Sequence, residues 1–459
     1  MSKTVSETLV AFMQEYAEKG VPDRVFHETK RLVLNQLKAS VGAHDHPAVA
    51  ILRNWVELSG SKGKAHVLWH GDMVSAESAA VVNGALFEVL DFNDTHIPTY
   101  QHAVSGVLPA VLALAEIDGH SGRDFVNALA IGIEVELAVA TILIPTAYYR
   151  GFVPGGLTGG VGAAAACAVI AGLTSDQMRN AIGLAMVSAF GLYASVGSMG
   201  LPYIMGMTAR SGLNAAEIAS LGMTAPSTAF EGDKGMLESH SDESPEKIAG
   251  VLAQLGSTWR VLKQTYKTVP TETITHAPLE CLFQILPRIN GRTVDRMELL
   301  VEPIVVKIAN ERMERFGKPS SDLTARFDTR FCVASALKRG TFTIAEMMEA
   351  AYTDPEILAM REKIELIADP KRPTFDGCSL SVYFTDGTSE FANVDDFVGT
   401  PGNPMTDEQL SDVFRRSAGS HISAGHIEDI LEAVWALDTA PNVGRLTSLL
   451  NFNLENVCA

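Results

Sequence analysis

Apolar residues recur at helical spacing from residue 5 to about residue 260, and this periodicity constrains the fold more than any other feature of the chain. The stretches SETLVAFMQEYAE, HETKRLVLNQLKASVG and SAESAAVVNGALFEVLD each place apolar side chains three or four positions apart, as one buried face of a helix requires. Many such stretches begin at Ser or Thr and stop at Gly, the residues that favour helix starts and ends. No fixed repeat period is found, which favours a compact bundle over a solenoid.

The pattern changes near residue 265. Residues 297–311 (MELLVEPIVVKIANE) and 378–394 (CSLSVYFTDGTSEFANV) indicate strands, and the pair Asp386-Gly387 predicts a hairpin turn in the second stretch. Helices are expected between them, and after residue 402 the pattern becomes helical again. We therefore expect a mainly α protein, in which a large all-helical domain carries a smaller α+β lid domain. The expected boundaries are 1–264 and 403–459 for the helical domain and 265–402 for the lid.

Length and charge set limits on function. A chain of 459 residues exceeds what one hydrophobic core usually accommodates, which agrees with two domains. The net charge of −18 argues against nucleic acid and anionic membranes as partners, because both require a basic face. Residues 128–145 are strongly apolar, but they contain Glu134 and Glu136, and charged groups are costly in a bilayer. This segment is therefore expected to be a buried core helix.

Cysteine usage and the first residues indicate a cytoplasmic protein. The five cysteines are odd in number and form no CxxC pair, so we expect reduced thiols that mostly serve packing. The first twenty residues are amphipathic and acidic, without the basic and apolar parts of a signal peptide. The glycine-rich run at 155–162 fits neither phosphate-binding pattern, which favours close helix packing there.

The densest group of polar residues is LDFNDTHIPTYQH at 90–102, which follows an apolar helical run. It contains Asp91, Asp94, Thr95, His96 and His102. The histidine spacing matches no H-x3-H or H-E-x-x-H pattern, and the EF-hand pattern is absent, so we expect no metal. Each residue alone could serve only as a helix cap or a surface group. As a group in a loop between two buried helices they indicate a site, because site residues concentrate in such loops.

A second group, TYKTVPTETITHAPLE at 265–280, lies where the helical pattern ends. Lys267 could bind the carboxylate of a substrate, or act as a base if burial lowers its pKa; an exposed linker lysine is the plain alternative. Arg326 and Arg330 lie four residues apart and could bind a carboxylate. With Asp328 between them, a solvated salt-bridge face is the simpler interpretation.

Together, NGALFEVLDFNDTHIP, His102, GVLPAVLALAE, GLTGGVGAAAACAVIAGL and KTVPTETITH resemble the MmgE/PrpD family, from about residue 5 to residue 455. The family includes 2-methylcitrate dehydratases, cis-aconitate decarboxylases and an iminodisuccinate epimerase. The resemblance implies a helical domain built from both chain ends, an α+β lid, and a site between the two. It also implies a homodimer that needs no organic cofactor and acts on small di- or tricarboxylates by moving a proton next to a carboxylate.

By resemblance, Asp91, Thr95 and His102 correspond to family site residues in the first motif. Lys267 corresponds to the lysine of the second motif, and His276 to a histidine downstream of it. We expect His102 and Lys267 to form the acid/base pair, with Asp91 setting the charge or orientation of one partner. Thr95 and His276 are expected to bind substrate. For Asp94 and His96, substrate binding and a purely structural role both stay open.

The sequence also departs from the family pattern. Leu201 stands where members often carry a lysine, with Ile204 at a commonly polar position, and Met313 stands where decarboxylases carry a tyrosine. Glu88 stands where a histidine is frequent before the first motif. Fewer positive groups suit a substrate with fewer carboxylates, or one that carries an amine. We therefore expect a dehydratase-like lyase, with an epimerase, a decarboxylase and an inactive binding relative as the alternatives.

Overall fold

The computed structural model describes residues 4–372 and 374–452, and it confirms a mainly α protein with a smaller α+β part. The chain divides into two compact units. Unit 1 comprises Met1–Val89, Asn93–Thr265 and Thr406–Ala459, and unit 2 comprises Leu90–Phe92 and Tyr266–Met405. Four of the cysteines are buried free thiols, as expected for packing groups, and Cys458 lies outside the described residues.

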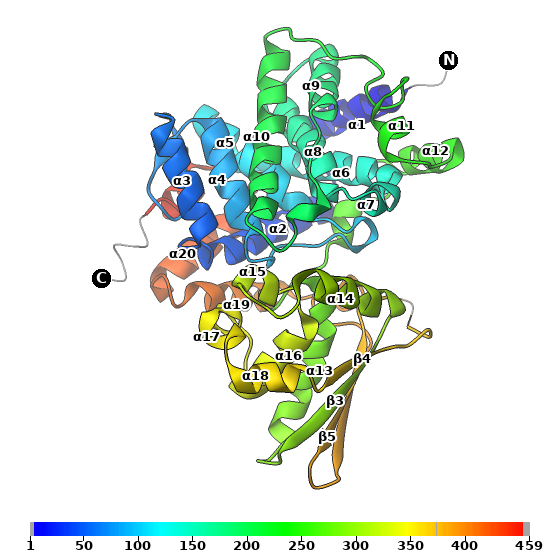
Figure 1. The fold of residues 1–459 in the computed structure, drawn as a ribbon. Helices are drawn as coiled ribbons and strands as arrows, with labels where there is room; N and C mark the ends of the chain where they lie inside the picture. Colours follow the sequence, from blue (N-terminus) through cyan, green and yellow to red (C-terminus); the bar gives the residue numbers. More distant parts are fainter. Residues whose placement is uncertain (1–3, 373, 453–459) are drawn as a thin grey trace. The chain divides into compact units, whose positions relative to one another are not determined.

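Three long helices form the centre of unit 1. Helix α8 (Pro154–Ile170) packs against α6 (Gly122–Leu143) and α10 (Gly200–Ser220), and all three are visible in the upper part of Figure 1. Helix α6 is long and apolar enough to cross a membrane, but 89% of its apolar window is buried inside the structure. The prediction of a buried core helix at this position is therefore confirmed.

The remaining elements of unit 1 surround these three helices. Helices α4 (Ala76–Glu88) and α5 (Ala103–Asp118) pack against α10 and α8. The others are α1 (Val5–Lys19), α2 (Asp23–Val41), α3 (Pro47–Leu58), α7 (Thr146–Tyr149), α9 (Ser175–Val187), α11 (Met236–His240), α12 (Pro245–Ala253), α19 (Asp407–Ala418), α20 (Ala424–Trp435), α21 (Gly444–Leu449), and the short ribbon of β1 (Ala65–His66) and β2 (Met73–Val74). The helical periodicity gave no indication of this ribbon.

Helix starts in unit 1 follow the sequence signals. The side chain of Ser121 accepts a hydrogen bond at the start of α6, and Thr4 and Thr174 form capping boxes at α1 and α9. Ser75 is the first residue before α4 and has extended backbone angles, although its side chain does not cap the helix. Each cap satisfies a backbone N–H group that has no partner inside the helix.

Glycine allows the helix backbones of unit 1 to touch. A Cβ atom added at Gly206 would lie 2.2 Å from the carbonyl oxygen of Val81 on α4, and one added at Gly84 would lie 2.8 Å from the Cα of Gly206. On α8, an added Cβ at Gly159 would lie 2.6 Å from the side chain of Thr208. The glycine-rich run therefore serves close helix packing, as the sequence predicted.

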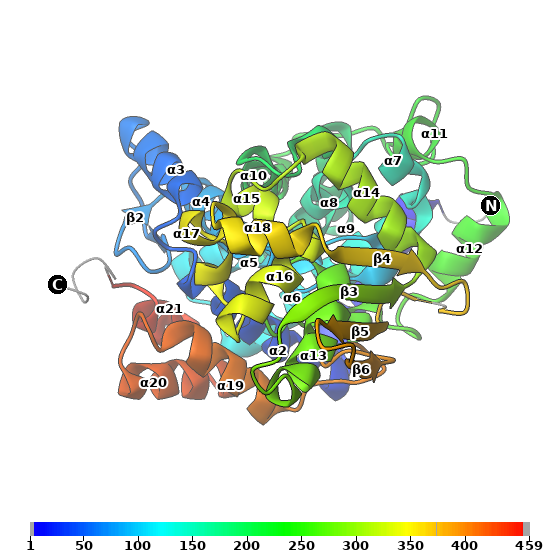
Figure 2. The ribbon, with the colours of Figure 1, turned by 60° about the horizontal axis from the view of Figure 1, so that its bottom comes forward.

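Unit 2 is built on a four-stranded sheet. The strands β3 (Val294–Val301), β4 (Ile364–Ala368), β5 (Cys378–Phe384) and β6 (Ser389–Val394) lie in the order β4-β3-β5-β6, which Figure 2 shows. Strands β3 and β4 are parallel, and the other two pairings are antiparallel.

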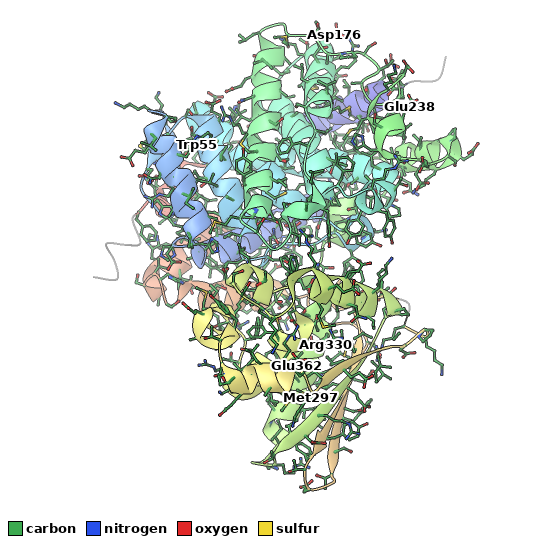
Figure 3. All side chains as sticks on the ribbon, in the orientation of Figure 1. Trp55, Asp176, Glu238, Met297, Arg330 and Glu362 are labelled. Atoms are coloured by element: carbon green, nitrogen blue, oxygen red, sulfur yellow. The ribbon has the colours of Figure 1, made fainter. Side chains whose placement is uncertain are left out.

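One face of this sheet forms the core of unit 2. Met297 of β3, labelled in Figure 3, and Leu380 of β5 are fully buried. Helices α13 (His276–Ile285), α14 (Pro303–Phe316) and α16 (Thr329–Arg339) pack against the sheet or against each other. The shorter helices are α15 (Asp322–Ala325), α17 (Glu349–Tyr352) and α18 (Pro355–Arg361).

The strand predicted over residues 297–311 is wrong beyond Val301. The strand ends there, and α14 begins at Pro303 because proline fits the first position of a helix and cannot donate to a sheet. The predicted hairpin is confirmed: β5 and β6 pair in antiparallel register, and Gly387 in the turn has a φ of +84°.

The close contact between α4 and α10 predicts a large effect of one added methyl group. Gly206→Ala should lower the free energy of unfolding by about 1–3 kcal/mol, because the new Cβ would overlap the Val81 carbonyl. Gly250→Ala on α12 is the matched control, since nothing lies within 4 Å of its added Cβ. Thermal unfolding should place Gly206→Ala below the wild type and Gly250→Ala at or above it; equal melting temperatures for the two variants would contradict this packing.

Candidate active site

The polar loop of the first motif connects α4 to α5. Helix α4 ends at Glu88 and α5 begins at Ala103, so His102 occupies the position just before the first turn of α5. Inside unit 1 the loop is fixed to a second segment, because the backbones of Thr95 and Thr265 exchange two hydrogen bonds of 3.0 and 2.8 Å. The two predicted motifs are thus linked by backbone pairing at these threonines.

Two residues in this loop have left-handed backbone angles. Asp91 has a φ of +49° and Tyr100 a φ of +53°. Non-glycine residues rarely adopt such angles, although aspartate tolerates them better than most. Backbone strain of this kind clusters at functional sites, where the surrounding structure maintains it. The left-handed angle therefore supports Asp91 as a site residue.

His102 is oriented by the loop itself. Its Nδ1 lies 2.5 Å from the backbone oxygen of Asp94 and 3.3 Å from Oγ1 of Thr95. A carbonyl oxygen can only accept, so Nδ1 carries the proton and Nε2 carries the lone pair. The side chain of His102 is 22% exposed, and Nε2 lies 4.0 Å from Oε1 of Glu88. His102 therefore has the tautomer that a general base requires.

Glu88 was not predicted as a site residue from the sequence, where it stood out only as a departure from the family pattern. Its side chain is 1% exposed, and Oε2 accepts a 2.7 Å hydrogen bond from Nδ2 of Asn93. The same amide nitrogen lies 2.7 Å from Oγ of Ser105. The one available signal was a glutamate on the apolar last turn of a helix, directly before the polar loop.

Asp94 and His96 point into the interior of unit 1. Asp94 is fully buried, and its Oδ1 accepts a 2.6 Å hydrogen bond from Nε2 of Gln36. Nδ1 of His96 lies 2.7 Å from Oγ1 of Thr99. Burial, together with the nearby positive charges of Arg260 and Lys263, lowers the pKa of His96 to about 3. His96 is therefore neutral at ordinary pH, and both side chains make hydrogen bonds inside unit 1.

A buried acid anchors the same loop from α6. Glu136 is fully buried, and Nε2 of Gln101 donates a 3.2 Å hydrogen bond to its Oε1. Oγ1 of Thr158 on α8 donates in turn to Oε1 of Gln101 at 3.0 Å. Burial, with the negative charge of Asp94 as a second cause, raises the pKa of Glu136 well above its usual value. Burial therefore disfavours the charged form of Glu136, which serves the loop as a hydrogen-bond acceptor.

Unit 2 brings Asp91 and Lys267 into contact. Lys267 is fully buried, and its Nζ forms an ion pair with Oδ1 of Asp91 and donates a 2.7 Å hydrogen bond to the Asp91 backbone oxygen. A buried ammonium group needs such partners, because removing a charge from water costs several kcal/mol. Lys267 is thus a buried ion-paired lysine, and the exposed-linker alternative is wrong.

Arg326 adds a second buried cation to unit 2. Its guanidinium forms an ion pair with Asp322, and Oγ1 of Thr271 donates a 2.8 Å hydrogen bond to its backbone oxygen. Burial lowers the pKa of Arg326, while the negative charges of Asp322 and Asp91 act in the opposite direction. Arg330, labelled in Figure 3, instead bonds to Oδ1 of Asn310 at 3.3 Å. The solvated-face interpretation is wrong for Arg326.

His276 begins α13 and is nearly fully buried. Its ring stacks on Phe397 with centroids 5.2 Å apart. His276 also lines a cavity of about 420 Å³ in unit 2, together with Thr268 and Glu280. Burial raises the pKa of Glu280, whose Oε2 accepts a 2.9 Å hydrogen bond from the Val398 backbone. A role of His276 in substrate binding stays a prediction.

Two of the positions that depart from the family pattern, Leu201 and Met313, have apolar or open surroundings. Leu201 packs against a small apolar cluster of Val153, Ile204 and Met205 in unit 1. Met313 lies on α14 in unit 2 and is 41% exposed. Neither position supplies a charge. Across residues 4–372 and 374–452, no three His, Cys, Asp or Glu side chains are grouped so that they could hold a metal ion.

The fold and these residues define a mainly α protein with an oriented histidine in one unit and a buried carboxylate–lysine pair in the other. The chain belongs to the MmgE/PrpD family: the MmgE/PrpD N-terminal domain matches residues 7–249, and the C-terminal domain matches residues 269–439. The resemblance seen in the sequence is therefore confirmed.

Curated relatives extend over nearly the whole chain. The chain is 25% identical to the cis-aconitate decarboxylase of Homo sapiens, over 98% of this chain and 95% of the relative. It is also 25% identical to the cis-aconitate decarboxylase of Aspergillus terreus, over 97% and 96%. The cis-aconitate decarboxylase-like protein oryM of Aspergillus oryzae is 23% identical, over 98% of both chains.

The low pKa of His96 predicts a specific loss of stability in acid. The unfolded chain takes up a proton at His96 near pH 6.5, whereas the folded protein does so only near pH 3. The contribution of His96 to the free energy of unfolding is therefore fully present above pH 6.5. It falls by about 1.4 kcal/mol per pH unit as the pH drops towards 3. Urea unfolding at pH 7.5 and 5.5 should show a smaller loss for His96→Gln than for the wild type. His120→Gln, on the surface of unit 1, should lose as much as the wild type.

Proposed function

We propose that this protein is an enzyme that moves a proton at a carbon next to a carboxylate of a small di- or tricarboxylic acid. The observation that carries this proposal is the oriented His102 in unit 1 together with the buried Asp91–Lys267 ion pair in unit 2. Proton removal at such a carbon needs a base, and it needs positive charge for the enolate-like intermediate. His102 is proposed to provide the base, and Lys267 the positive charge.

Lys267 is proposed to supply the positive charge. Its ammonium group is held in place by the ion pair with Asp91, and it is proposed to attract a substrate carboxylate and stabilise the charge that develops on it. A preorganised interaction of this kind in a dry site contributes about 3–4 kcal/mol to catalysis. Thr95 and His276 are proposed to hydrogen-bond the substrate, and Asp94 and His96 to hold the loop that carries these groups.

His102 is proposed to take the proton. The Asp94 backbone oxygen holds the proton on Nδ1, which leaves the lone pair on Nε2. If a hydroxyl group then leaves, the reaction is a dehydration, and we propose a hydro-lyase similar to 2-methylcitrate dehydratase. If the proton returns to the opposite face of the carbon, the reaction is an epimerisation. Both outcomes use the same residues, and neither requires an organic cofactor.

Decarboxylation is the second candidate, and the relatives favour it. Those named above carry the name cis-aconitate decarboxylase or cis-aconitate decarboxylase-like protein, which makes a lyase acting on a tricarboxylic acid a reasonable expectation. The apolar surroundings of Leu201 and the absence of a phenol at Met313 argue against decarboxylation. They do not by themselves select a dehydratase, because 2-methylcitrate carries as many carboxylates as cis-aconitate.

Incubation with candidate acids in deuterated water separates these reactions. The panel comprises 2-methylcitrate, citrate, cis-aconitate, malate and iminodisuccinate, followed by proton NMR and carbon dioxide release. A new alkene without carbon dioxide indicates dehydration; for 2-methylcitrate it is seen as a methyl signal on a double bond, because both alkene carbons of that product lack hydrogen. Carbon dioxide release indicates decarboxylation. Deuterium at the α-carbon without an alkene indicates epimerisation. A protein that binds these acids and produces none of these signals is the inactive binding relative.

Substitution of the two proposed reacting residues should abolish most of the activity. Lys267→Met and His102→Gln should each lower turnover by about 100-fold or more, because each removes charge or proton transfer from the reaction. Lys318→Ala, an exposed lysine of unit 2, and His120→Gln are the matched controls and should keep wild-type rates. Steady-state rates, with circular dichroism to verify folding, provide the measurement. Near-normal turnover in Lys267→Met or His102→Gln would remove that residue from the mechanism.

Chelation tests the proposal that no metal takes part. Activity should persist after incubation with a strong chelator and removal of the complex by gel filtration. Recovery of a lost activity on adding back a divalent cation would contradict this part of the proposal.

A further inference from the structure

The carboxylate of Glu88 faces the nitrogen of His102 that the proposed function uses as the base. We propose that Glu88 is a positioning residue for His102, whose carboxylate stabilises the imidazolium that forms when Nε2 takes up a proton. This inference rests on the proposed function for its role in turnover. The pairing of the two side chains within unit 1 can also be tested without substrate.

The position of the Glu88 side chain is fixed by its helix, by burial and by a hydrogen bond. It is the last residue of α4, its side chain is 1% exposed, and Oε2 accepts the 2.7 Å hydrogen bond from Asn93. Asn93 is itself held by Ser105 on α5. A carboxylate that is removed from water is expensive unless a positive charge or hydrogen-bond donors compensate it. The side chain of Glu88 is therefore unable to turn towards solvent without losing these contacts.

The distance between the two side chains determines how Glu88 acts. Oε1 of Glu88 lies 4.0 Å from Nε2 of His102, too far for a hydrogen bond but close enough for a strong interaction between opposite charges. Neutral imidazole gains little from the carboxylate, whereas imidazolium gains much more. Glu88 therefore favours the protonated form of His102 without accepting its proton.

Three other titratable groups near the loop, Asp94, Glu136 and His96, make contacts of their own. The carboxylate of Asp94 accepts from Gln36, and Glu136 accepts from Gln101, while burial and the charge of Asp94 raise the pKa of Glu136. His96 is neutral because burial lowers its pKa to about 3. Thr95 and the Asp94 backbone contact the opposite nitrogen, Nδ1. The carboxylate of Glu88 lies on the side of the other nitrogen, Nε2.

In the dehydration, the stabilised imidazolium connects the two halves of the reaction. Nε2 takes the proton from the carbon next to the carboxylate, the C–H bond breaks, and its electron pair moves into the enolate. The imidazolium then returns a proton to the leaving hydroxyl as the C–O bond breaks, so that water departs and the alkene forms. Glu88 stabilises the charge that exists between these two steps, and no other reactant is needed.

The experiment compares Glu88→Gln with Glu88→Asp and with Glu116→Gln. Glutamine keeps the size of the side chain and can still accept from Asn93, but it lacks the charge. Glu116→Gln is the matched control, because Glu116 forms a half-buried pair with another histidine, His66, elsewhere in unit 1. Its 2.9 Å bond to the His66 backbone can also be accepted by glutamine.

Two measurements on the intact chain report on the pairing. One is the pH profile of kcat/KM, in which activity falls in acid as His102 becomes protonated. The other is the rate at which diethylpyrocarbonate modifies His102, followed by mass spectrometry of the His102 peptide over the same pH range. The second measurement requires no substrate and reports directly on the neutral imidazole.

For Glu88→Gln, both inflections should move to lower pH by about one unit, which is a tenfold change in proton affinity. The value of kcat should fall about tenfold while KM changes less. Glu88→Asp should lie between this variant and the wild type, and Glu116→Gln should match the wild type. A modification profile of Glu88→Gln or Glu88→Asp identical to that of the wild type overturns the inference. A shifted modification profile in a protein without acid–base activity would retain the pairing and reject the proposed function instead.

Discussion

The arrangement of unit 1 depends on helix backbones that touch. Gly206 of α10 rests on the Val81 carbonyl of α4, and a single added Cβ there would lie 2.2 Å from that oxygen. Helices α8 and α10 approach each other through glycine in the same way. The polar loop between α4 and α5 has an exposed part around Pro98 and Tyr100, but Asp91, Asp94 and His96 are buried. Their polar groups must find partners inside the protein.

That requirement explains the contacts around the proposed site. A buried polar group without a partner costs about 1–3 kcal/mol, and a buried charge costs more. In unit 1, hydrogen bonds join the loop to Gln36, Glu88 and Glu136. In unit 2 the buried charges of Asp91 and Lys267 are paired with each other. The same contacts hold a histidine tautomer and an ammonium group ready, so stability and the proposed chemistry have a common physical origin.

Some of this could be predicted from the sequence, and some could not. Helical periodicity, cap residues and the Asp-Gly turn predicted the fold class and the β5–β6 hairpin, because these are local signals. The strand prediction failed after Val301 because a short apolar run does not distinguish a strand from a helix. Pro303 starts helix α14 at this point. Lys267 could be predicted as a candidate site residue from the sequence, but its burial could not be predicted. Glu88 was missed because nothing in its spacing shows which side chain its carboxylate faces.

The sequence by itself determined the helical body, the α+β segment, the membership in the MmgE/PrpD family and the two motifs rich in site residues. These properties follow from periodicity and residue identity, which act over a few neighbours along the chain. Only the tertiary structure decided that Asp91 and Lys267 form a buried pair across 176 positions, that Asp94 orients His102 through its backbone oxygen, and that Glu88 faces His102. These contacts arise from helix packing and from the need to satisfy buried charge, which no local pattern in the chain records.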